Sequence, residues 1–432
     1  MRGSDLDVVV VGGGLAGLAC AVHLQRNGLT VRLLEASDAV GGRVRTDAVD
    51  GFLLDRGFQV LLTAYPEAKR VLDYGSLDLR AFEPGARVRV DGAFHRVVDP
   101  WRRPGQLPAT LAAPVGTLGD KLRMARLRHR LLRGASAGNR QGASTTLEAL
   151  KGEGFTSSMI DRFFRPFFAG VFLENELATS SRFFEFVFRM FAVGDAALPA
   201  RGMGAIAEQL AARLEPETVE TQSAVARVEG GGVVTWTGRR VDARAVVVAC
   251  DGAASATLLP RLEAPGARSV TCVYYAAEEP PFAEPVLILD GDRAGPVNNL
   301  CVPSQVAPGY APPGAALVSA SVIGLPPVGD PQLDVAVRAQ LEGWFGSAVR
   351  RWQHLRTYRI AHALPVMSGR TNFRDPRVGR GIYVCGDHWE GPSLQSSLRS
   401  GRRAAEAVME DLGAGGARGA AAMPRDRKDD LR

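Results

Sequence analysis

The first candidate chemistry in this sequence is phosphate binding by a glycine-rich turn near its beginning. The turn reads Gly12-Gly13-Gly14-Leu15-Ala16-Gly17. In such a turn Gly12 permits a tight bend, Gly14 lets the backbone approach a phosphate, and Gly17 lets a helix pack closely on a strand. The turn must therefore lie between a strand and a helix whose N-terminal amides and positive dipole face the anion.

The sequence around the turn supplies both elements and an acidic partner. Residues 7–11 form a continuous apolar, β-branched run typical of a buried parallel strand, and 15–27 has the pattern of a helix. A second strand is predicted at 30–35, and it ends on Glu35, 18 residues after Gly17. A carboxylate there accepts hydrogen bonds from ribose hydroxyls and disfavours a 2′-phosphate. The full set predicts a dinucleotide site and counts against a glycine-rich turn without a ligand.

A second glycine motif follows Glu35 and narrows the choice of cofactor. Ala36 leads through a short stretch to Gly41-Gly42-Arg43. This segment resembles the extended diphosphate motif of the flavin amine oxidase and phytoene desaturase superfamily, in which the glycines and the arginine form a second wall around the diphosphate. A planar, permanently charged guanidinium matches phosphate oxygens. The resemblance implies FAD, and we expect it to be bound without a covalent link.

Three further segments strengthen this resemblance. Residues 383–387 and 392–401 resemble the family's second FAD fingerprint, in which the acid, here Asp387, bonds the ribityl chain. The dipole of the following helix would stabilise negative charge at the pyrimidine end of the flavin. Asp55-Arg56-Gly57 resembles a segment that runs close to the flavin, and Val225 lies in one that resembles the adenine-contacting strand. The residues expected around FAD are Gly12, Gly14, Leu15, Ala16, Gly17, Glu35, Ala36, Gly41, Gly42, Arg43, Gly57, Val225, Gly386, Asp387, Ser393 and Leu394.

The resemblance covers most of residues 5–412 and implies an α/β fold. A Rossmann-type FAD-binding domain with a parallel sheet and a β-meander is expected to carry an interleaved α+β substrate domain. The meander is expected from three stretches, at 224–228, 233–236 and 245–249. The chain is long enough for two domains. The FAD-binding domain is expected over 1–75, 200–266 and 360–412, the substrate-binding domain over 76–199 and 267–359, and a flexible tail over 413–432.

Phenylalanine is concentrated in the predicted substrate domain. Ten of the eighteen phenylalanines lie within residues 163–191. One interpretation is a helical core, because large rings are usually buried. The other is an aromatic tunnel that leads an apolar substrate to the flavin, and one pair of helices can serve both purposes. The side chains expected to contact the substrate are Phe168, Phe172, Phe184 and Phe188.

Composition argues against several classes of function. The net charge of +6 is spread over 432 residues without the dense basic and aromatic pattern of a nucleic-acid-binding protein. The five cysteines are odd in number, scattered and without CxxC spacing, so neither a disulfide framework nor a metal site is expected. The first residues lack the features of a signal peptide, and no run of about 18 apolar residues occurs. A cytoplasmic protein without a membrane span is expected.

A basic segment leaves peripheral membrane contact open. Residues 121–133 interleave six lysine or arginine side chains with leucine and methionine. One interpretation is an amphipathic helix at the inner face of the membrane. The other, which we favour, is a solvated helix face. Plant-type desaturases of the superfamily are peripheral membrane enzymes, so the resemblance gives the first interpretation some support.

Two departures from the amine oxidase pattern bear on the reaction. Many amine oxidases place a lysine of the substrate domain near the flavin, but this chain has no lysine from 152 to 427. Where monoamine oxidases place one tyrosine of an aromatic cage, this chain has Ser393. With the phenylalanines, these departures favour an FAD-dependent oxidoreductase that transfers hydride from a hydrophobic substrate to flavin N5. Such an enzyme would be desaturase-, dehydrogenase- or isomerase-like and act on a polyene or isoprenoid.

Two other functions stay open. An FAD-dependent amine or amino-acid oxidase of secondary metabolism needs little acid–base assistance, because a neutral amine is oxidised to an imine. Proteins of the GDP dissociation inhibitor type share the fold and bind prenylated partners without flavin. The intact glycines, together with Glu35, Arg43 and Asp387, count against this second class.

No constellation of histidine, serine and aspartate marks a catalytic site. The side chains expected near the flavin with a catalytic role are His388 and Trp389, directly after Asp387, and Arg56. Each has a plainer interpretation: a hydrogen bond within a loop for the histidine, a packed indole for the tryptophan, and a phosphate-side cation for the arginine.

Overall fold

Strands from both ends of the chain build a six-stranded sheet. The computed structural model describes residues 6–134, 144–366 and 374–414. In spatial order the strands are β10 (Val219–Glu220), β2 (Val31–Leu34), β1 (Val8–Val11), β14 (Ala245–Val248), β21 (Ile382–Val384) and β20 (Arg377–Gly379). All neighbours are parallel except β20 and β21. The four residues of β1 are buried valines, as expected of a strand covered on both faces.

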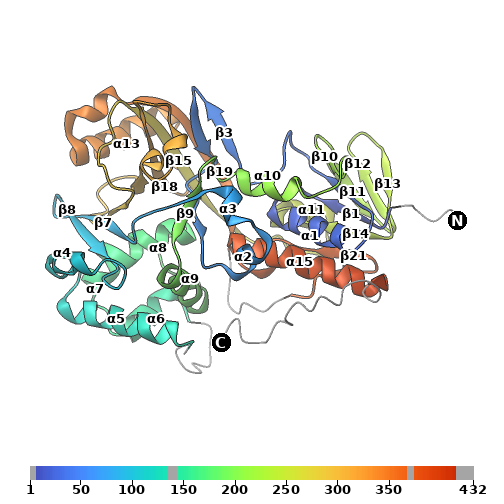
Figure 1. The fold of residues 1–432 in the computed structure, drawn as a ribbon, viewed down its shortest axis with the longest axis horizontal. Coiled ribbons are helices and arrows are strands. Elements are labelled where there is room, and N and C mark those ends of the chain that lie inside the picture. Colours follow the sequence, from blue (N-terminus) through green and yellow to red (C-terminus); the bar gives the residue numbers. More distant parts are fainter. Residues whose placement is uncertain (1–5, 135–143, 367–373, 415–432) are drawn as a thin grey trace.

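Two helices from opposite ends of the chain pack side by side on this sheet. They are α1 (Leu15–Arg26) and α15 (Leu394–Asp411) (Figure 1). Their backbones lie so close that a Cβ on Gly401 would collide with the carbonyl oxygen of Ala16. On the other face, valines of β1 and β14 share a buried cluster with a three-stranded antiparallel sheet. Its strands are β11 (Val225–Glu229), β12 (Gly232–Thr235) and β13 (Arg240–Asp242).

A seven-stranded sheet forms the second part of the molecule. In spatial order its strands are β19 (Gln353–Pro365), β15 (Ala267–Ala277), β18 (Ala316–Ile323), β17 (Val297–Cys301), β16 (Leu287–Asp290), β7 (Gly85–Val90) and β8 (Ala93–Val98). Only β16 and β7 pair in parallel. Helix α13 (Asp330–Phe345) buries Leu333, Val337 and Leu341 against one face. The side chains of the opposite face join the core that contains the phenylalanine cluster.

A group of helices lies beneath that opposite face, at the lower left of Figure 1. The segments are α4 (Leu107–Ala112), α5 (Leu118–Leu132), α6 (Thr146–Gly152), α7 (Ser157–Met159), the π-helical turn η2 (Ile160–Phe164), α8 (Arg165–Phe172) and α9 (Ser181–Val193). Helix α5 begins with a capping box, because Thr117 accepts from the Asp120 amide and Asp120 accepts from the Thr117 amide. Its start is therefore well defined.

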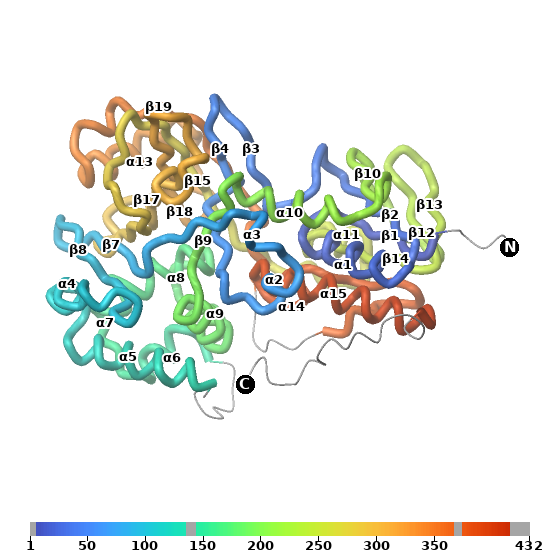
Figure 2. The backbone as a smooth tube through the Cα atoms, in the orientation of Figure 1, coloured from blue at the N-terminus to red at the C-terminus, as the bar shows by residue number. Residues whose placement is uncertain are grey.

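Short elements join the two parts. The hairpin of β3 (Thr46–Val49) and β4 (Phe52–Asp55) extends toward the seven-stranded sheet (Figure 2). The remaining strands are β5 (Leu61–Leu62), β6 (Leu79–Ala81) and β9 (Ala196–Pro199), and the remaining helices are α2 (Pro66–Val71), α3 (Tyr74–Leu77), α10 (Ala205–Ala211), α11 (Gly252–Leu258), α12 (Pro303–Val306) and α14 (Asp387–Glu390). Three 3-10 turns are η1 (Pro104–Gln106), η3 (Pro308–Tyr310) and η4 (Gly346–Arg351).

The predicted α/β fold is confirmed, with one correction to the meander. Residues 245–248 form β14 of the parallel sheet, and the third meander strand is β13. All four residues of β14 are buried, which suits a strand between two neighbours better than an edge. The domain limits stay predictions. Strand β19 crosses the limit that is predicted between residues 359 and 360. Most of the tail predicted at 413–432 lies outside the described residues.

Candidate functional site

One cavity of about 1460 Å³ connects the parallel sheet with the helices beneath the seven-stranded sheet. Gly12 and Gly14 line it beside β1, Ile360 lines it from β19, and Phe167 lines it from α8. The two glycine motifs and part of the phenylalanine cluster therefore face the same space. A concave, largely apolar space with a few convergent polar groups is the usual form of a ligand site.

The first glycine turn connects β1 to α1. Gly12 has φ +107°, and a Cβ there would lie 3.0 Å from the Ala249 carbonyl oxygen. A Cβ on Gly14 would meet no atom within 4 Å, so this residue leaves open space in the cavity wall. Gly17 does not line the cavity, because its Cα faces the carbonyl oxygen of Gly12. The first amides of α1 have no partner within the helix, and the turn presents them to this space.

The second glycine turn lies beside the first in the cavity wall. Gly41 and Gly42 have φ values of +112° and +57°, which glycine adopts readily. The Gly41 amide donates to the Gly13 carbonyl oxygen at 2.8 Å, and a Cβ on Gly42 would lie 3.4 Å from the Gly14 Cα. The two turns thus touch and leave the cavity between them and the flanking side chains.

Glu35 lies at the end of β2 and is held in place by amide and hydroxyl donors. Its Oε2 accepts from the Gly13 amide at 2.6 Å, and its Oε1 accepts from the Ser37 amide at 2.8 Å and the Ser37 hydroxyl at 2.6 Å. The residue is buried yet lines the cavity together with Ala36. Its position therefore suits the acceptor of ribose hydroxyls that its place in the sequence predicts.

Arg43 and Asp387 form an ion pair at the cavity wall. Arg43 Nη2 donates to Asp387 Oδ1 at 2.7 Å, and Nη1 donates to the Ala363 carbonyl oxygen at 2.7 Å. Gly386, with φ +145°, places Asp387 at the start of α14. Arg43, Gly386 and Asp387 all line the cavity. A cation and an anion from distant parts of the chain therefore meet beside the glycine turns.

These groups fit a dinucleotide cofactor. Two glycine turns without Cβ atoms, free helix amides, a carboxylate and a guanidinium are the donors and acceptors that diphosphate and ribose need. Helix α15 adds its N-terminus, since Ser393 caps it by accepting from the Ser396 amide at 3.1 Å. Gly57, Val225, Ser393 and Leu394 also line the cavity. Of the residues expected around FAD, all but Gly17 do so.

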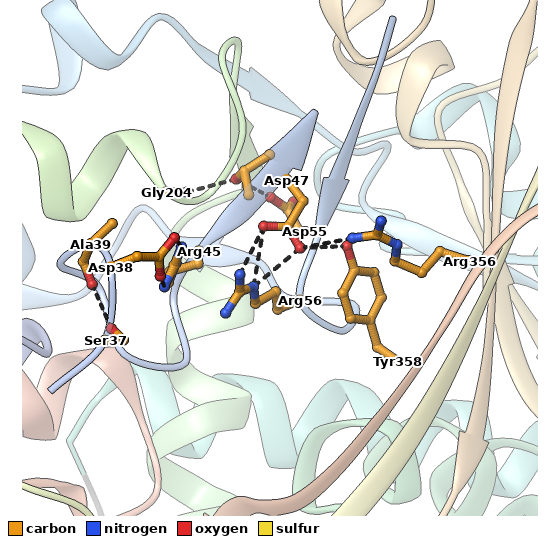
Figure 3. Close-up of polar contacts among 11 residues, drawn as sticks. Ser37, Asp38, Ala39, Arg45, Asp47, Asp55, Arg56, Gly204, Arg356 and Tyr358 are labelled. Atoms are coloured by element: carbon orange, nitrogen blue, oxygen red, sulfur yellow. Dashed lines mark hydrogen bonds and ion pairs between the residues drawn. The ribbon is translucent and has the colours of Figure 1, made fainter. Parts of the chain in front are cut away.

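Arg56 lines the cavity, but its guanidinium already has a partner. Its Nη2 donates to Asp47 Oδ1 at 2.9 Å (Figure 3). Tyr358 of β19 donates its hydroxyl to the same carboxylate at 2.7 Å, and Arg356 lies 3.5 Å from it. Since a guanidinium does not give up its proton, this arrangement favours a positioning cation over a proton acceptor.

Asp55, in the same motif, is a buried carboxyl that sequence reasoning did not single out. Its Oδ1 accepts from the Thr46 hydroxyl at 2.6 Å and the Met203 amide at 2.9 Å. Its Oδ2 accepts from the Tyr310 hydroxyl at 2.8 Å. Burial raises the pKa of this carboxyl to about 6 in spite of these donors. Asp55 does not line the cavity, and its contacts join the hairpin to the rest of the molecule.

His388 and Trp389 lie outside the cavity lining. Both ring nitrogens of His388 are buried without a partner among the described residues, and burial lowers the pKa of the imidazole. Trp389 donates its indole N–H to the Asp375 carbonyl oxygen at 3.1 Å, and the Arg374 guanidinium lies 5.0 Å from its ring centre. Their predicted catalytic roles gain no support from this geometry, and a packed indole describes Trp389 better.

The phenylalanine cluster divides between cavity wall and core. Of the four predicted substrate contacts, Phe168 and Phe188 line the cavity, whereas Phe172 and Phe184 are buried among other side chains and do not. Phe184 packs edge-on against Phe168, with ring centres 4.9 Å apart. Some rings of the cluster therefore form the core and others form part of the cavity wall, and their contact with a substrate stays a prediction. The other phenylalanines of 163–191 that line the cavity are Phe163, Phe167 and Phe191.

Several polar lining residues were not anticipated. Glu83, Asp99, Arg102, Lys121 and Arg128 line the part of the cavity beside β8 and α5. Lys121 Nζ donates to the carbonyl oxygens of Leu111 and Ala113 at 2.5 and 2.9 Å. Burial lowers the pKa of this ammonium group. The only signal in the sequence was the basic character of 121–133.

The described ranges contain neither a cluster of metal-binding side chains nor a membrane-spanning helix. Those residues contain no group of three or more histidine, cysteine, aspartate or glutamate side chains that could hold a metal ion. In the same part of the chain, no helix is both long enough and apolar enough to cross a membrane.

Comparison with known proteins identifies a family that spans most of the chain and relatives that match short segments of it. The model of the family described as flavin containing amine oxidoreductase matches residues 15–409. Putrescine oxidase of Kocuria rosea is 46% identical over 94 residues, which are 21% of this chain and 20% of that protein. Carotenoid 3,4-desaturase of Haloarcula japonica is 49% identical over 57 residues, 12% of each chain. The matched segments thus cover a fifth or less of these curated relatives.

A solved structure shares the fold over nearly the whole chain. An oxidoreductase from Methanosarcina mazei superposes with a TM-score of 0.73 at 20% identity, over 94% of this chain and 100% of that one. At this identity the likeness concerns the fold alone. It agrees with a family match that runs from α1 into α15.

Proposed function

This chain belongs to the flavin-containing amine oxidoreductase family, and on that premise we propose that it oxidises a hydrophobic substrate of the polyene or isoprenoid class. The proposed reaction is of the desaturase, dehydrogenase or isomerase kind. The observation that carries the proposal is the single cavity that joins the two glycine turns to walls of phenylalanine. A flavin enzyme needs its cofactor and its substrate in one space, because the protein must place the reacting atoms of the two together.

The proposed cofactor is FAD, bound without a covalent link. Glu35 would accept from the ribose, the amides of α1 and Arg43 would hold the diphosphate, and Asp387 would bond the ribityl chain. When bound, the flavin supplies a hydride acceptor. Among the described lining residues Cys250 is the only cysteine and there is no histidine. Its thiol lies beside β1 near Glu35, and burial raises its pKa to about 12, so it is a poor candidate for a covalent link.

The substrate part of the cavity supports an apolar ligand. Phe163, Phe167, Phe168, Phe188 and Phe191 line it together with valines and leucines. Such walls orient a long apolar chain through contact area and exclude water from the reacting carbon. The carotenoid desaturase of Haloarcula japonica is one named relative whose substrate is of this kind.

Amine oxidation remains the second candidate, and one residue favours it. Glu83 lines the cavity, and no lysine or arginine among the described residues forms an ion pair with it within 4.0 Å. A carboxylate in this position would attract an ammonium substrate. Putrescine oxidase of Kocuria rosea is a named relative that oxidises an amine. One observation counts against amine oxidation. Many amine oxidases place a lysine near the flavin, but Lys121 is the one lysine in the described lining, and its ammonium group already donates to two carbonyl oxygens.

The first experiment is the visible spectrum of the purified protein. A yellow protein with the absorption of oxidised flavin is expected, whereas a colourless protein that takes up no added FAD would overturn the cofactor assignment. That second result would instead favour the flavin-free, prenyl-binding alternative.

The second experiment separates the two reactions. The flavin-loaded protein is mixed without oxygen with long-chain polyenes in detergent and, separately, with a panel of amines. Loss of the flavin colour with polyenes is expected. Loss of colour with amines alone would overturn the preference, and Glu83→Gln would then be expected to raise the amine concentration needed for half-maximal reduction.

A further inference from the structure

Part of the cavity lining is also exposed surface. Five large apolar side chains between β8 and the middle of α5 line the cavity and yet are 40–65% exposed. They are Trp101, Leu107, Leu111, Leu118 and Leu122, and we call them the apolar rim. Large apolar groups that gather on a surface mark an interaction site more often than scattered ones do.

The geometry of the two helices sets the apolar rim at one edge of the molecule. Leu107 and Leu111 are four residues apart on α4, and Leu118 and Leu122 are four apart on α5, so each pair shares a helix face. Lys121 connects the helices through its bonds to the carbonyl oxygens of Leu111 and Ala113. In Figure 1, α4 and α5 lie at the outer edge, far from the parallel sheet.

Beyond Leu122, the one exposed large apolar side chain of α5 is Leu132, at 36%. Leu127 and Leu131 are buried in the main core, so the apolar side of residues 121–133 faces inward. If residues 121–133 lay flat on a membrane, which is the less favoured of the two interpretations of this segment, these two side chains would not contact lipid. The exposed apolar surface lies instead at the first turns of α5 and on α4.

Cations outnumber anions around the apolar rim. Residues 99–133 contain eight arginine or lysine side chains and two aspartates. Carboxylates from outside this segment pair with two of the arginines: Asp195 with Arg102, and Glu153 and Glu185 with Arg130. Both aspartates are engaged: Asp120 is buried and caps α5, and Asp99 lies 3.4 Å from Arg128. Arg103, Arg126 and Arg133 are exposed. Leucine and tryptophan surrounded by cations match an anionic lipid surface, which offers hydrocarbon beneath negative headgroups.

We propose that the apolar rim docks on an anionic lipid bilayer and that the substrate passes from the bilayer directly into the cavity. This inference rests on the proposed function, because only an apolar substrate would be dissolved in the bilayer. An aqueous route would require such a substrate to leave lipid for water first, which is costly for each buried CH₂ group. A cavity mouth made of leucines removes that step.

The test measures binding of the flavin-loaded protein to vesicles, without substrate. Vesicles of phosphatidylcholine with phosphatidylglycerol are compared with vesicles of phosphatidylcholine alone, at low and high salt. Binding to the anionic vesicles is expected, and it should weaken with salt. Leu118→Asp combined with Leu122→Asp is expected to weaken it at least about tenfold. Val335→Asp is the matched control, since this residue is 68% exposed on α13 and lies away from the cavity.

A second measurement does not depend on the charged variants. Brominated lipid quenches tryptophan that enters the bilayer, so quenching is expected in the wild type and should decrease in Trp101→Phe. The docking proposal would be overturned if the wild-type protein did not bind anionic vesicles. It would also be overturned if the leucine double variant bound these vesicles as tightly as Val335→Asp does. If the double variant instead abolishes a dimer seen in sedimentation, the rim contacts a second copy and the lipid proposal is wrong.

The polyene experiment in detergent keeps this proposal separate from the proposed function. If polyenes reduce the flavin but the protein does not bind vesicles, only the docking proposal is rejected. If the protein binds vesicles but only amines reduce the flavin, the proposed substrate class is rejected. The protein would then be an amine oxidase that binds lipid.

Discussion

Arg43 and Asp387 lie 344 residues apart in the sequence and share a 2.7 Å ion pair at the wall of the cavity. Arg43 comes from the second glycine turn, and Asp387 follows the last strand of the parallel sheet. The carboxylate is almost entirely buried, whereas the guanidinium is partly exposed. The pair therefore joins the first and last parts of the cofactor site and holds both charges beside the glycine turns.

This pairing predicts coupled losses of FAD affinity. We expect Arg43→Met and Asp387→Asn each to raise the FAD dissociation constant at least about tenfold, because each leaves the other group unpaired. The double variant should lose less affinity than the two single losses combined. Titration of the apoproteins with FAD, followed by flavin fluorescence, measures all four states. Strictly additive losses would mean that the two residues act on FAD independently.

Alanine substitutions at Gly14 and Gly17 should affect different properties: the first should lower FAD affinity, and the second should lower stability. Gly14→Ala places a methyl group in the open space of the cavity and should cost about 1 kcal/mol or less in stability. Its FAD affinity should nevertheless fall at least about tenfold, because that space is where the diphosphate is expected. Gly17→Ala would push its methyl group into the Gly12 carbonyl oxygen and should cost about 1–3 kcal/mol or more. Denaturant unfolding of the apoproteins and FAD titration distinguish the two, and wild-type affinity in Gly14→Ala would contradict the assignment.

Phe184 and Phe188 lie one turn apart on α9 and should give opposite results. Phe184 is buried and contacts the rings of Phe164 and Phe168, so Phe184→Ala should cost roughly 3–5 kcal/mol in stability. Phe188 lines the cavity and is partly exposed, so Phe188→Ala should cost less stability but raise the KM for the longest substrate. Thermal unfolding and anaerobic flavin reduction with substrates of graded length measure the two effects. Equal KM values in both variants would argue against a substrate wall at Phe188.

The cofactor residues could be predicted because short segments carry them. Gly12, Gly14 and Glu35 belong to one strand–turn–helix–strand unit, whose spacing alone brings them together. The fold class followed from the same unit and from the resemblance of the later segments. Such local geometry needs no knowledge of how distant parts of the chain pack.

The division of the phenylalanines could not be predicted in the same way. Phe168 and Phe172 are one turn apart on α8, yet only Phe168 reaches the cavity. Which face of α8 is covered depends on α9 and the seven-stranded sheet, and those contacts are set by the whole fold. Likewise His388 follows Asp387 directly, but of these two residues only Asp387 lines the cavity.

The burial of Asp55 could not be predicted from its motif either. This burial leads to a prediction of how stability depends on pH. Tyr310 and Tyr274, which bury Asp55 and bond its carboxyl and carbonyl oxygens, are 255 and 219 residues away in the sequence. Burial raises the pKa of Asp55 from 3.8 to about 6, so the folded protein keeps this proton to a higher pH than the unfolded chain does. Folding therefore takes up a proton between about pH 4 and pH 6, and the contribution of Asp55 to stability decreases as the pH rises through that window.

We expect Asp55→Asn to remove this dependence. Asparagine keeps an oxygen acceptor for Thr46 and the Met203 amide, and its amide nitrogen can donate to the Tyr310 hydroxyl. Between about pH 4 and 7, the free energy of unfolding of the wild type should fall by roughly 3 kcal/mol relative to that of the variant, because the shift is about two pKa units. Urea unfolding at several pH values measures this difference. Asp78→Asn serves as the control, because Asp78 forms an exposed ion pair with Arg80. The free energy of unfolding of this variant should change with pH in parallel with that of the wild type. Parallel curves for the wild type and Asp55→Asn would show that Asp55 ionises at the same pH in both states.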